Sequence, residues 1–303
     1  MNDDPEAFRV RDAEARGLTP AALRRVEWER PFHGIRRWHR DTGPPRGVRD
    51  RVVDLCRALL PALPEGAFFS HVTAAILWGL PLPAALELHD APLHVTTRSG
   101  NALRRRGVVG HLRRSAPPHV LRAGIPVSTP IDTWVDCRAT LDDIELVVVG
   151  DALAGEWSPY RGAHHCDPSD LVAAARKAIG KGSARLRRAA TRIRAGSKSP
   201  QETRLRLALV ESGLPEPEIN VTKYGPDGAW LGAADLAYDE QRLAIEYEGD
   251  YHRTDRDQWF ADIARRERFD DAGWRTVRVT AADMRHLDAL CTRIARLHRE
   301  RTP

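Results

Sequence analysis

The chain has 303 residues, 42% of them hydrophobic and 29% charged, which is the composition of a globular protein of about two domains. No apolar stretch reaches the length of a membrane span and no signal peptide begins the chain, so we expect a cytoplasmic protein without a membrane partner. The net charge of +5 favours a polyanionic partner only weakly, because the distribution of basic residues matters more than their sum.

Residues 1–45 are predicted to form a small helical unit. We expect one helix over residues 8–16 and a second after Thr19, a typical N-cap, with Pro20 at its first position. Two helices joined by a short glycine-containing turn are typical of a helix-turn-helix, and residues 28–38 are expected to add a wing hairpin. A small helical bundle without a role in DNA binding is the alternative interpretation.

Residues 46–154 are predicted to form an α+β domain. Ser70 is the expected N-cap of a helix over residues 72–78, which Gly79 ends. Strands are expected over residues 93–97 and 108–112, the first because its polar and apolar residues alternate.

Three polar residues of this domain are not expected to form a site. His71 is expected to be a cap or packing residue rather than a metal ligand. Asp132 and Asp136 lie on one side of a helix expected to begin at Thr129, so we expect both at the surface.

Several motifs of this domain are similar to one known module. They are Phe-Ser-His-Val-Thr-Ala-Ala-Ile-Leu-Trp-Gly-Leu-Pro-Leu-Pro over residues 69–83, His-Val-Thr over 94–96, a basic hairpin over 104–111 and Ile-Pro-Val-Ser-Thr-Pro over 125–130. With these motifs, residues 46–151 resemble the AbiEi-type antitoxin domain, a module led by a winged helix. The resemblance implies DNA binding, although the helical unit before it is shorter than is usual for that module.

Residues 155–198 are predicted to be a basic helical connector that ends in a hinge over residues 196–200. His164, His165 and Cys166 lie together there, but no second pair of ligands is nearby, so no metal site is expected. The four cysteines are widely spaced without a C-x-x-C pair, and we expect them to be reduced thiols.

Seven basic residues are candidates for binding nucleic acid. Three lie in the basic hairpin and four lie in the connector, where apolar residues form one side of a helix. Each group can follow a phosphate backbone or be a solvated surface, and the sequence does not decide between the two. The seven are Arg104, Arg105, Arg106, Lys181, Arg185, Arg188 and Arg192.

Residues 199–303 are predicted to fold in the order helix, three strands, helix, strand and helix. Ser199 is the expected N-cap of the first helix, with Pro200 at the first position and Glu202 completing a capping box. The strands are expected over residues 219–224, 231–238, 242–248 and 274–279, and the later helices over 256–272 and 281–299.

Three acids lie within the second and third of these strands. Glu246 and Glu248 are two residues apart and therefore project from one face, which Asp235 joins if the strands pair antiparallel. Strand interiors rarely hold acids unless that face is solvated or something binds the charge. A hard cation such as Mg²⁺ would relieve the repulsion among the three, and a solvated strand face is the alternative.

This order of elements resembles the PD-(D/E)xK nuclease superfamily, and more closely the DUF559 group, which is related to very-short-patch-repair endonucleases. The matching residues are Glu202, Asp235, Glu246-Tyr247-Glu248-Gly249, His252 and the run Trp-Phe-Ala-Asp-Ile-Ala-Arg over residues 259–265. The resemblance implies that a winged-helix-like and α+β region precedes a restriction-endonuclease-like domain, an α+β or α/β protein overall. The superfamily motif ends in Lys where this chain has Glu248, which leaves Glu248, His252 or Lys223 as the general base.

The resemblance implies a metal-dependent DNA endonuclease acting in DNA repair, phage defence or a toxin–antitoxin-like system. Asp235, Glu246 and the carbonyl of Tyr247 would bind Mg²⁺ or Mn²⁺, which lowers the pKa of a bound water. Glu202 would hold a metal-bound water or a second ion, and Arg265 would contact the scissile phosphate or pair with Asp262. A homodimer is compatible with this activity.

Two interpretations of a different kind stay open. The chain would be a non-catalytic DNA-binding regulator of the antitoxin type if its last domain is only a scaffold. It would be a protein-interaction partner if it binds no nucleic acid.

Overall fold

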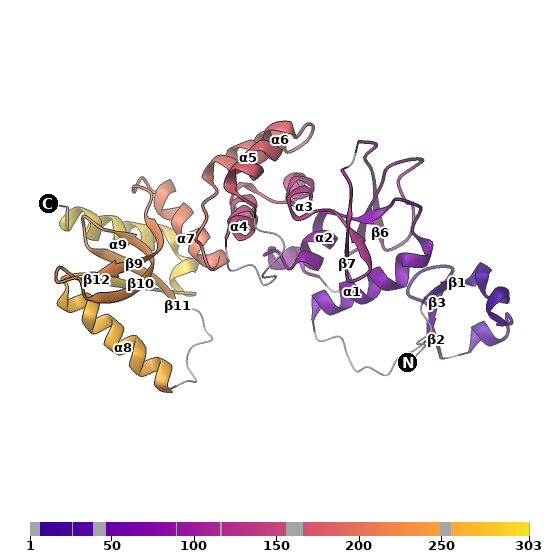
Figure 1. The fold of residues 1–303 in the computed structure, drawn as a ribbon, viewed down its shortest axis with the longest axis horizontal. Helices are drawn as coiled ribbons and strands as arrows, with labels where there is room; N and C mark the ends of the chain where they lie inside the picture. The colour runs from indigo at the N-terminus through magenta and orange to yellow at the C-terminus, as the bar shows by residue number, and fades with distance from the viewer. Residues whose placement is uncertain are drawn as a thin grey trace. The chain divides into compact units, whose positions relative to one another are not determined.

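The computed structural model describes residues 7–25, 27–38, 47–88, 90–115, 117–155, 166–248 and 256–302, with the backbone alone for residues 256–262. The protein is of the mixed α+β class, and its chain divides into two compact units (Figure 1). The first comprises residues 1–149 and 162–191, and the second comprises residues 150–161 and 192–303. None of the described helices has both the length and the apolar character needed to cross a membrane.

Residues 7–38 form a small antiparallel sheet in place of the two expected helices. Its strands are β1 (Phe8–Arg9), β3 (Ile35–Trp38) and β2 (Trp28–Glu29), in that order. The hairpin of β2 and β3 is the one predicted over residues 28–38, and its turn contains Gly34 with φ 73°.

The helix-turn-helix prediction is wrong because aromatic residues of these strands pack against one another. The rings of Phe8 and Trp28 meet edge-on with centroids 5.3 Å apart, and Phe8 lies in β1, where it pairs with Arg36 of β3. The Thr19 hydroxyl accepts a hydrogen bond from the N–H of Ala22 (3.2 Å), but the N-cap position is occupied by Ala21, two residues after the predicted cap. The helix after it is only the 3₁₀ turn Ala22–Arg24, and 3₁₀ turns also occupy Val10–Asp12 and Glu14–Arg16.

The rest of the first unit is built on a five-stranded mixed sheet of order β6-β5-β4-β8-β7. β5 (Leu93–Thr97) and β6 (Val108–Leu112) confirm the predicted strands and pair in parallel. β4 (Phe68–Phe69) pairs antiparallel with β5 and parallel with β8 (Ile125–Val127), and β7 (Val120–Arg122) forms the far edge.

Helices make up much of the rest of the first unit. They are α1 (Val48–Leu59), α2 (His71–Trp78), α3 (Pro130–Asp136), α5 (Pro168–Lys177) and α6 (Ser183–Arg192), while α4 (Asp143–Ala154) crosses the division between the units. Ser70 and Gly79 bound α2 as predicted, and Thr129 caps α3 by accepting the N–H of Asp132 (3.2 Å). The Ser70 hydroxyl does not cap α2 and instead contacts other side chains.

The second unit contains a four-stranded sheet of order β12-β11-β10-β9. β9 (Glu218–Tyr224), β10 (Trp230–Tyr238) and β11 (Leu243–Glu248) are antiparallel neighbours, and β12 (Arg275–Thr280) pairs in parallel with β11. Each strand lies within one residue of its predicted bounds.

Helices cover both faces of this sheet (Figure 1). α7 (Pro200–Glu211) and α9 (Leu287–Glu300) pack on the face that carries Leu236, Ile245 and Val279. α8 (Arg256–Asp271) covers the opposite face, where its Phe269 meets small residues such as Ala237 and Ala244. α9 begins six residues later than predicted, because Asp283 accepts hydrogen bonds from the N–H and hydroxyl of Thr280 and a 3₁₀ turn comes first.

A buried ion pair joins the end of α4 to α7. Asp151 is fully buried and accepts hydrogen bonds from the Arg206 guanidinium (2.9 Å), the Thr203 hydroxyl (2.9 Å) and the N–H of Arg194 (2.8 Å). Arg206, 1% exposed, also pairs with Glu216. Because both charges are out of water, each requires the other.

Asp136, which was expected at the surface, is buried with 6% exposure and pairs with Arg113 (3.2 Å). Burial raises the pKa of this carboxyl to about 6, with the charge of Asp132 adding to the rise and Arg113 opposing it. The folded protein therefore binds this proton more tightly than the unfolded chain does. Above pH 6 the ionised Asp136 carboxylate lowers the free energy of unfolding. This loss of stability decreases as the pH falls from about 6 to 3.8.

We expect Asp136→Asn to increase the free energy of unfolding at pH 8, by up to about 3 kcal/mol, and to lose that advantage at pH 4. The amide keeps an oxygen for Arg113 and carries no charge to bury. Urea unfolding at several pH values measures the difference, with Asp90→Asn at an exposed position of the same unit as the matched control. Equal pH profiles for the parent and Asp136→Asn would contradict the assignment.

Candidate active site in the C-terminal unit

Asp235 and Glu246 lie next to each other on β10 and β11. The register pairs Leu236 with Ile245, so these two acids are the next residues along the antiparallel strands. The N–H of Tyr247 donates to Asp235 Oδ2 (2.8 Å), which holds the aspartate against the neighbouring strand. The predicted antiparallel meeting of these two acids is confirmed.

Glu246 is 8% exposed and is bound by Arg265 of α8. Two parallel hydrogen bonds join Arg265 to both carboxylate oxygens, at 2.7 and 2.9 Å, and a third runs to the carbonyl of Ala233 (2.8 Å). Gly232, at φ 130°, lets the arginine pass, because a Cβ there would lie 2.9 Å from Arg265 Cδ. Arg265 thus faces the acids, while the side chain of Asp262 is outside the described residues.

Glu202 approaches the pair from the first turn of α7. It is 6% exposed, and one carboxylate oxygen accepts the N–H of Lys198 (2.8 Å) and the side-chain amide of Asn220 (2.7 Å). Ser199 caps the helix as predicted, by accepting the N–H of Glu202 (3.2 Å). The predicted capping box is displaced by one residue, since Glu202 binds the N–H of Lys198 instead of that of Ser199.

The acids influence one another's protonation. Burial raises the pKa of Asp235 and the charge of Glu246 adds to the rise, while the N–H of Tyr247, Arg265 and Lys198 oppose it. Burial also raises the pKa of Glu202, and the charge of Asp235 contributes in the same direction. A cation near Asp235 would offset this cost, because it favours the ionised carboxylates.

The three candidates for the general base are placed differently. Glu248 is paired with Arg278 of β12, and both side chains are partly exposed. Lys223 is buried, and its ammonium is paired with Glu218 and Asp239 instead of with Asp235 or Glu246. His252 lies outside the described residues.

The donor set fits a hard divalent cation in its chemistry. Asp235 and Glu246 supply carboxylate oxygens, and Mg²⁺ is commonly bound by one or two carboxylates with water completing its shell. Among the described residues, the side-chain oxygens of these acids do not form a group of three ligand atoms within 4.8 Å of one another.

Most of the basic residues predicted to bind nucleic acid already contact protein atoms. Arg188 binds both oxygens of Asp143 at 3.0 Å, Arg192 pairs with Glu211 (2.6 Å), and Arg185 donates to the carbonyl of Leu141 (2.9 Å). Arg104, Arg106 and Lys181 are exposed.

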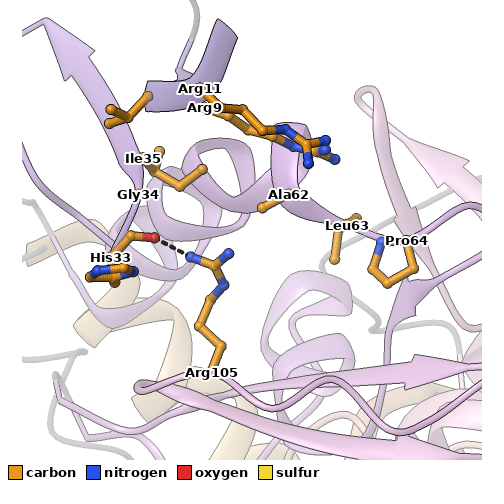
Figure 2. A pocket seen from close by; sticks show the side chains of 10 residues that line it. Arg9, Arg11, His33, Gly34, Ile35, Ala62, Leu63, Pro64 and Arg105 are labelled. Atoms are coloured by element: carbon orange, nitrogen blue, oxygen red, sulfur yellow. Dashed lines mark hydrogen bonds between the residues drawn. The ribbon is translucent and has the colours of Figure 1, made fainter.

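Arg105 lines a cavity of about 460 Å³ in the first unit (Figure 2). Its guanidinium donates to the carbonyl of His33. Figure 2 shows Arg9 and Arg11 on the opposite side of this cavity from Arg105. The cavity is therefore lined by cationic side chains from two segments that were predicted as separate elements, the helix over residues 8–16 and the basic hairpin over residues 104–111.

Three histidines of the first unit come together in a way that the sequence did not indicate. Ligand nitrogens of His71, His94 and His111 all lie within 4.8 Å of one another, and no other group of three potential ligand side chains among the residues described here is as compact as this limit. The histidines are separated by 23 and 17 residues, too far apart for a local spacing motif. In the sequence, the three histidines have in common only that each lies in or next to a predicted strand or helix, which does not indicate that they meet.

Comparison with known proteins leaves the family open. No family model matches the chain, and no solved structure matches it. Two curated relatives, the uncharacterized proteins MT2308 and Rv2248 of Mycobacterium tuberculosis (strains CDC 1551 / Oshkosh and ATCC 25618 / H37Rv), are each 31% identical over 101 residues, or 33% of this chain. The chain matches only 37% of the length of either relative.

We expect Arg265→Met to lower the free energy of unfolding by about 3 kcal/mol, because it removes the two charge-assisted hydrogen bonds that Arg265 donates to the buried Glu246 carboxylate. The matched change Arg278→Met removes the partner of the more exposed Glu248 and should cost less than about 1 kcal/mol. Urea unfolding of the full chain measures both. Equal decreases in the free energy of unfolding of the two variants would show that the burial of Glu246 does not make the loss of its arginine more destabilising.

Proposed function

We propose that the second unit is a metal-dependent DNA endonuclease that hydrolyses phosphodiester bonds. The observation that carries the proposal is the adjacent pair Asp235 and Glu246, held on antiparallel strands with Arg265 against them. The order of helix, three antiparallel strands, helix and parallel strand supports it, because it resembles the PD-(D/E)xK superfamily.

Asp235, Glu246 and the Tyr247 carbonyl are the groups that would hold Mg²⁺ or Mn²⁺. When bound, such an ion polarises a phosphoryl oxygen and lowers the pKa of a coordinated water. Arg265 would bind a phosphate oxygen, since a guanidinium suits phosphate as well as carboxylate. Glu202 would orient a water through its second oxygen.

The proton of the attacking water needs an acceptor. Glu248 projects from the same strand face as Glu246 and is partly exposed. It would therefore be in contact with water beside a bound substrate. His252 is the second candidate and lies outside the described residues. Lys223 is the weakest candidate, because Glu218 and Asp239 hold its ammonium.

A non-catalytic DNA-binding protein is the second candidate function. The observation that favours it is that both acids of the Glu-x-Glu pair already have arginine partners, Arg265 for Glu246 and Arg278 for Glu248. A scaffold whose acids are neutralised within the chain has no need of a metal ion. For either function, the exposed Arg104, Arg106 and Lys181 are the proposed phosphate contacts of the first unit.

We expect the full chain to cut plasmid DNA with Mg²⁺ or Mn²⁺, and Asp235→Asn and Glu246→Gln to lower the cleavage rate by about 100-fold or more. Both changes keep the size of the side chain and remove its charge. Asp239→Asn is the matched control, because Asp239 is an acid of the same unit that pairs with Lys223. Its cleavage rate should stay near that of the parent.

DNA binding measured at two salt concentrations separates the alternatives. Binding without cleavage by the parent would favour the non-catalytic function. Cleavage that survives Asp235→Asn would overturn the proposed site. Light scattering of the same samples tests whether a homodimer forms.

A further inference from the structure

The three histidines of the first unit are carried by three different elements. His71 is the first residue of α2, His94 lies in β5, and His111 lies in β6, the parallel neighbour of β5. All three are partly buried. His94 Nδ1 and His111 Nε2 are 3.0 Å apart, and the rings of His71 and His111 are stacked with centroids at 3.7 Å.

We propose that His71, His94 and His111 form a binding site for a divalent transition-metal ion of the zinc type. Imidazole nitrogens suit Zn²⁺, Co²⁺, Ni²⁺ and Cu²⁺, whereas Mg²⁺ prefers oxygen ligands. This site is therefore separate in chemistry from the acids of the second unit.

The nitrogen spacing agrees with such an ion. Zn–N bonds of about 2.0–2.1 Å at tetrahedral angles place the ligand nitrogens about 3.3 Å apart. The 3.0 Å separation of His94 and His111 is a few tenths of an ångström smaller, so a slight opening of this pair admits the ion. The rings of His71 and His111 are within 12° of parallel, so the His71 ring has to turn to direct its nitrogen to the same point.

Hydrogen bonds prepare His71 for this role. The Ser70 hydroxyl lies 2.9 Å from His71 Nδ1, and Thr96 donates to the same hydroxyl (2.7 Å). When Nδ1–H donates to Ser70, the lone pair of His71 is on Nε2, the arrangement commonly seen for ligating histidines. Ser70 and Thr96 are both buried, so this contact is protected from water.

The backbone of His71 has an uncommon conformation. Its φ of 52° lies in the left-handed region, which costs a residue with a Cβ roughly 1–2 kcal/mol. Strain of this kind persists where the surrounding structure requires one position of a side chain, and it is concentrated at functional sites. Here it accompanies the placement of the imidazole against His111.

The three histidines influence one another through their closeness. Burial lowers the pKa of His71 to about 2, with His111 and His94 adding to the shift, and lowers that of His94 to about 4, with His111 adding; burial lowers the pKa of His111 as well. Neutral imidazoles carry the lone pair that a metal ion needs. In their 3.0 Å contact one of His94 and His111 donates an N–H to the other, and a metal ion bound by both nitrogens would require the donor ring to carry that proton on its other nitrogen.

Three protein ligands leave a coordination position for water or a substrate atom. No fourth His, Cys, Asp or Glu among the described residues belongs to the group. The positive charges of Arg113 and Arg138 act on His71, and the Asp136 carboxylate offsets part of this charge because it pairs with Arg113. An open position is typical of zinc sites that react or exchange ligands, while purely structural zinc sites usually have four protein ligands.

The test is metal binding by the full chain. After treatment with a chelator and its removal, we expect the parent to take up about one Zn²⁺ or Co²⁺ per chain, measured by calorimetry and elemental analysis, and excess Mg²⁺ should not displace it. Cobalt should give the visible absorption of a nitrogen-ligated ion. His94→Ala and His111→Ala should weaken binding by about 100-fold or more, and Ser70→Ala by about 10-fold.

His33→Ala is the matched control, because His33 is an exposed histidine of the same unit. It should bind zinc as the parent does. The proposal is overturned if the parent takes up no stoichiometric ion, which would leave a stacked and hydrogen-bonded histidine cluster, or if folded His94→Ala and His111→Ala bind zinc as tightly as the parent. Because the cobalt spectrum is recorded on the parent, the result does not depend on the variants folding.

Discussion

The charge of Glu246 in the interior of the C-terminal sheet constrains much of the second unit. A buried carboxylate needs a charged partner, and Arg265 reaches it only because α8 crosses that face and Gly232 leaves room for the arginine stem. The same face carries small residues such as Ala237 and Ala244, which let α8 approach. Asp235 then takes the remaining position beside the pair, where the Tyr247 N–H fixes it.

Elements of the second unit were predictable because their apolar residues follow regular periods and their ends carry clear signals, such as Ser199 before α7 and Gly273 after α8. The N-terminal segment was not predictable in this way. Its residues have helical spacing, but the structure is set by a contact between Phe8 and Trp28, which lie far apart in the sequence. Side-chain partners were the least predictable feature. That Lys223 binds Asp239, and that Glu248 binds Arg278, depends on strand pairing that no local pattern records.

The two candidate sites differ in the kind of ligand and in how the sequence reveals them. Asp235 and Glu246 were found from the sequence because acids in apolar strands are unusual and the two strands are consecutive. His71, His94 and His111 meet only because β5 and β6 are parallel neighbours, although the chain between them forms no hairpin, and because α2 begins beside them. Oxygen ligands in one unit and nitrogen ligands in the other would give one chain two metal preferences.

The Asp151–Arg206 pair determines where the C-terminal unit can be separated from the rest of the chain. The hinge-like residues before Ser199 look like a natural boundary, yet Asp151 lies on α4, well upstream. A fragment starting at Ser199 would retain only Glu216, which is partly exposed, to balance the buried Arg206. The smallest autonomous folding unit therefore includes the end of α4, and the limits of this module in sequence are not those suggested by its acidic motifs.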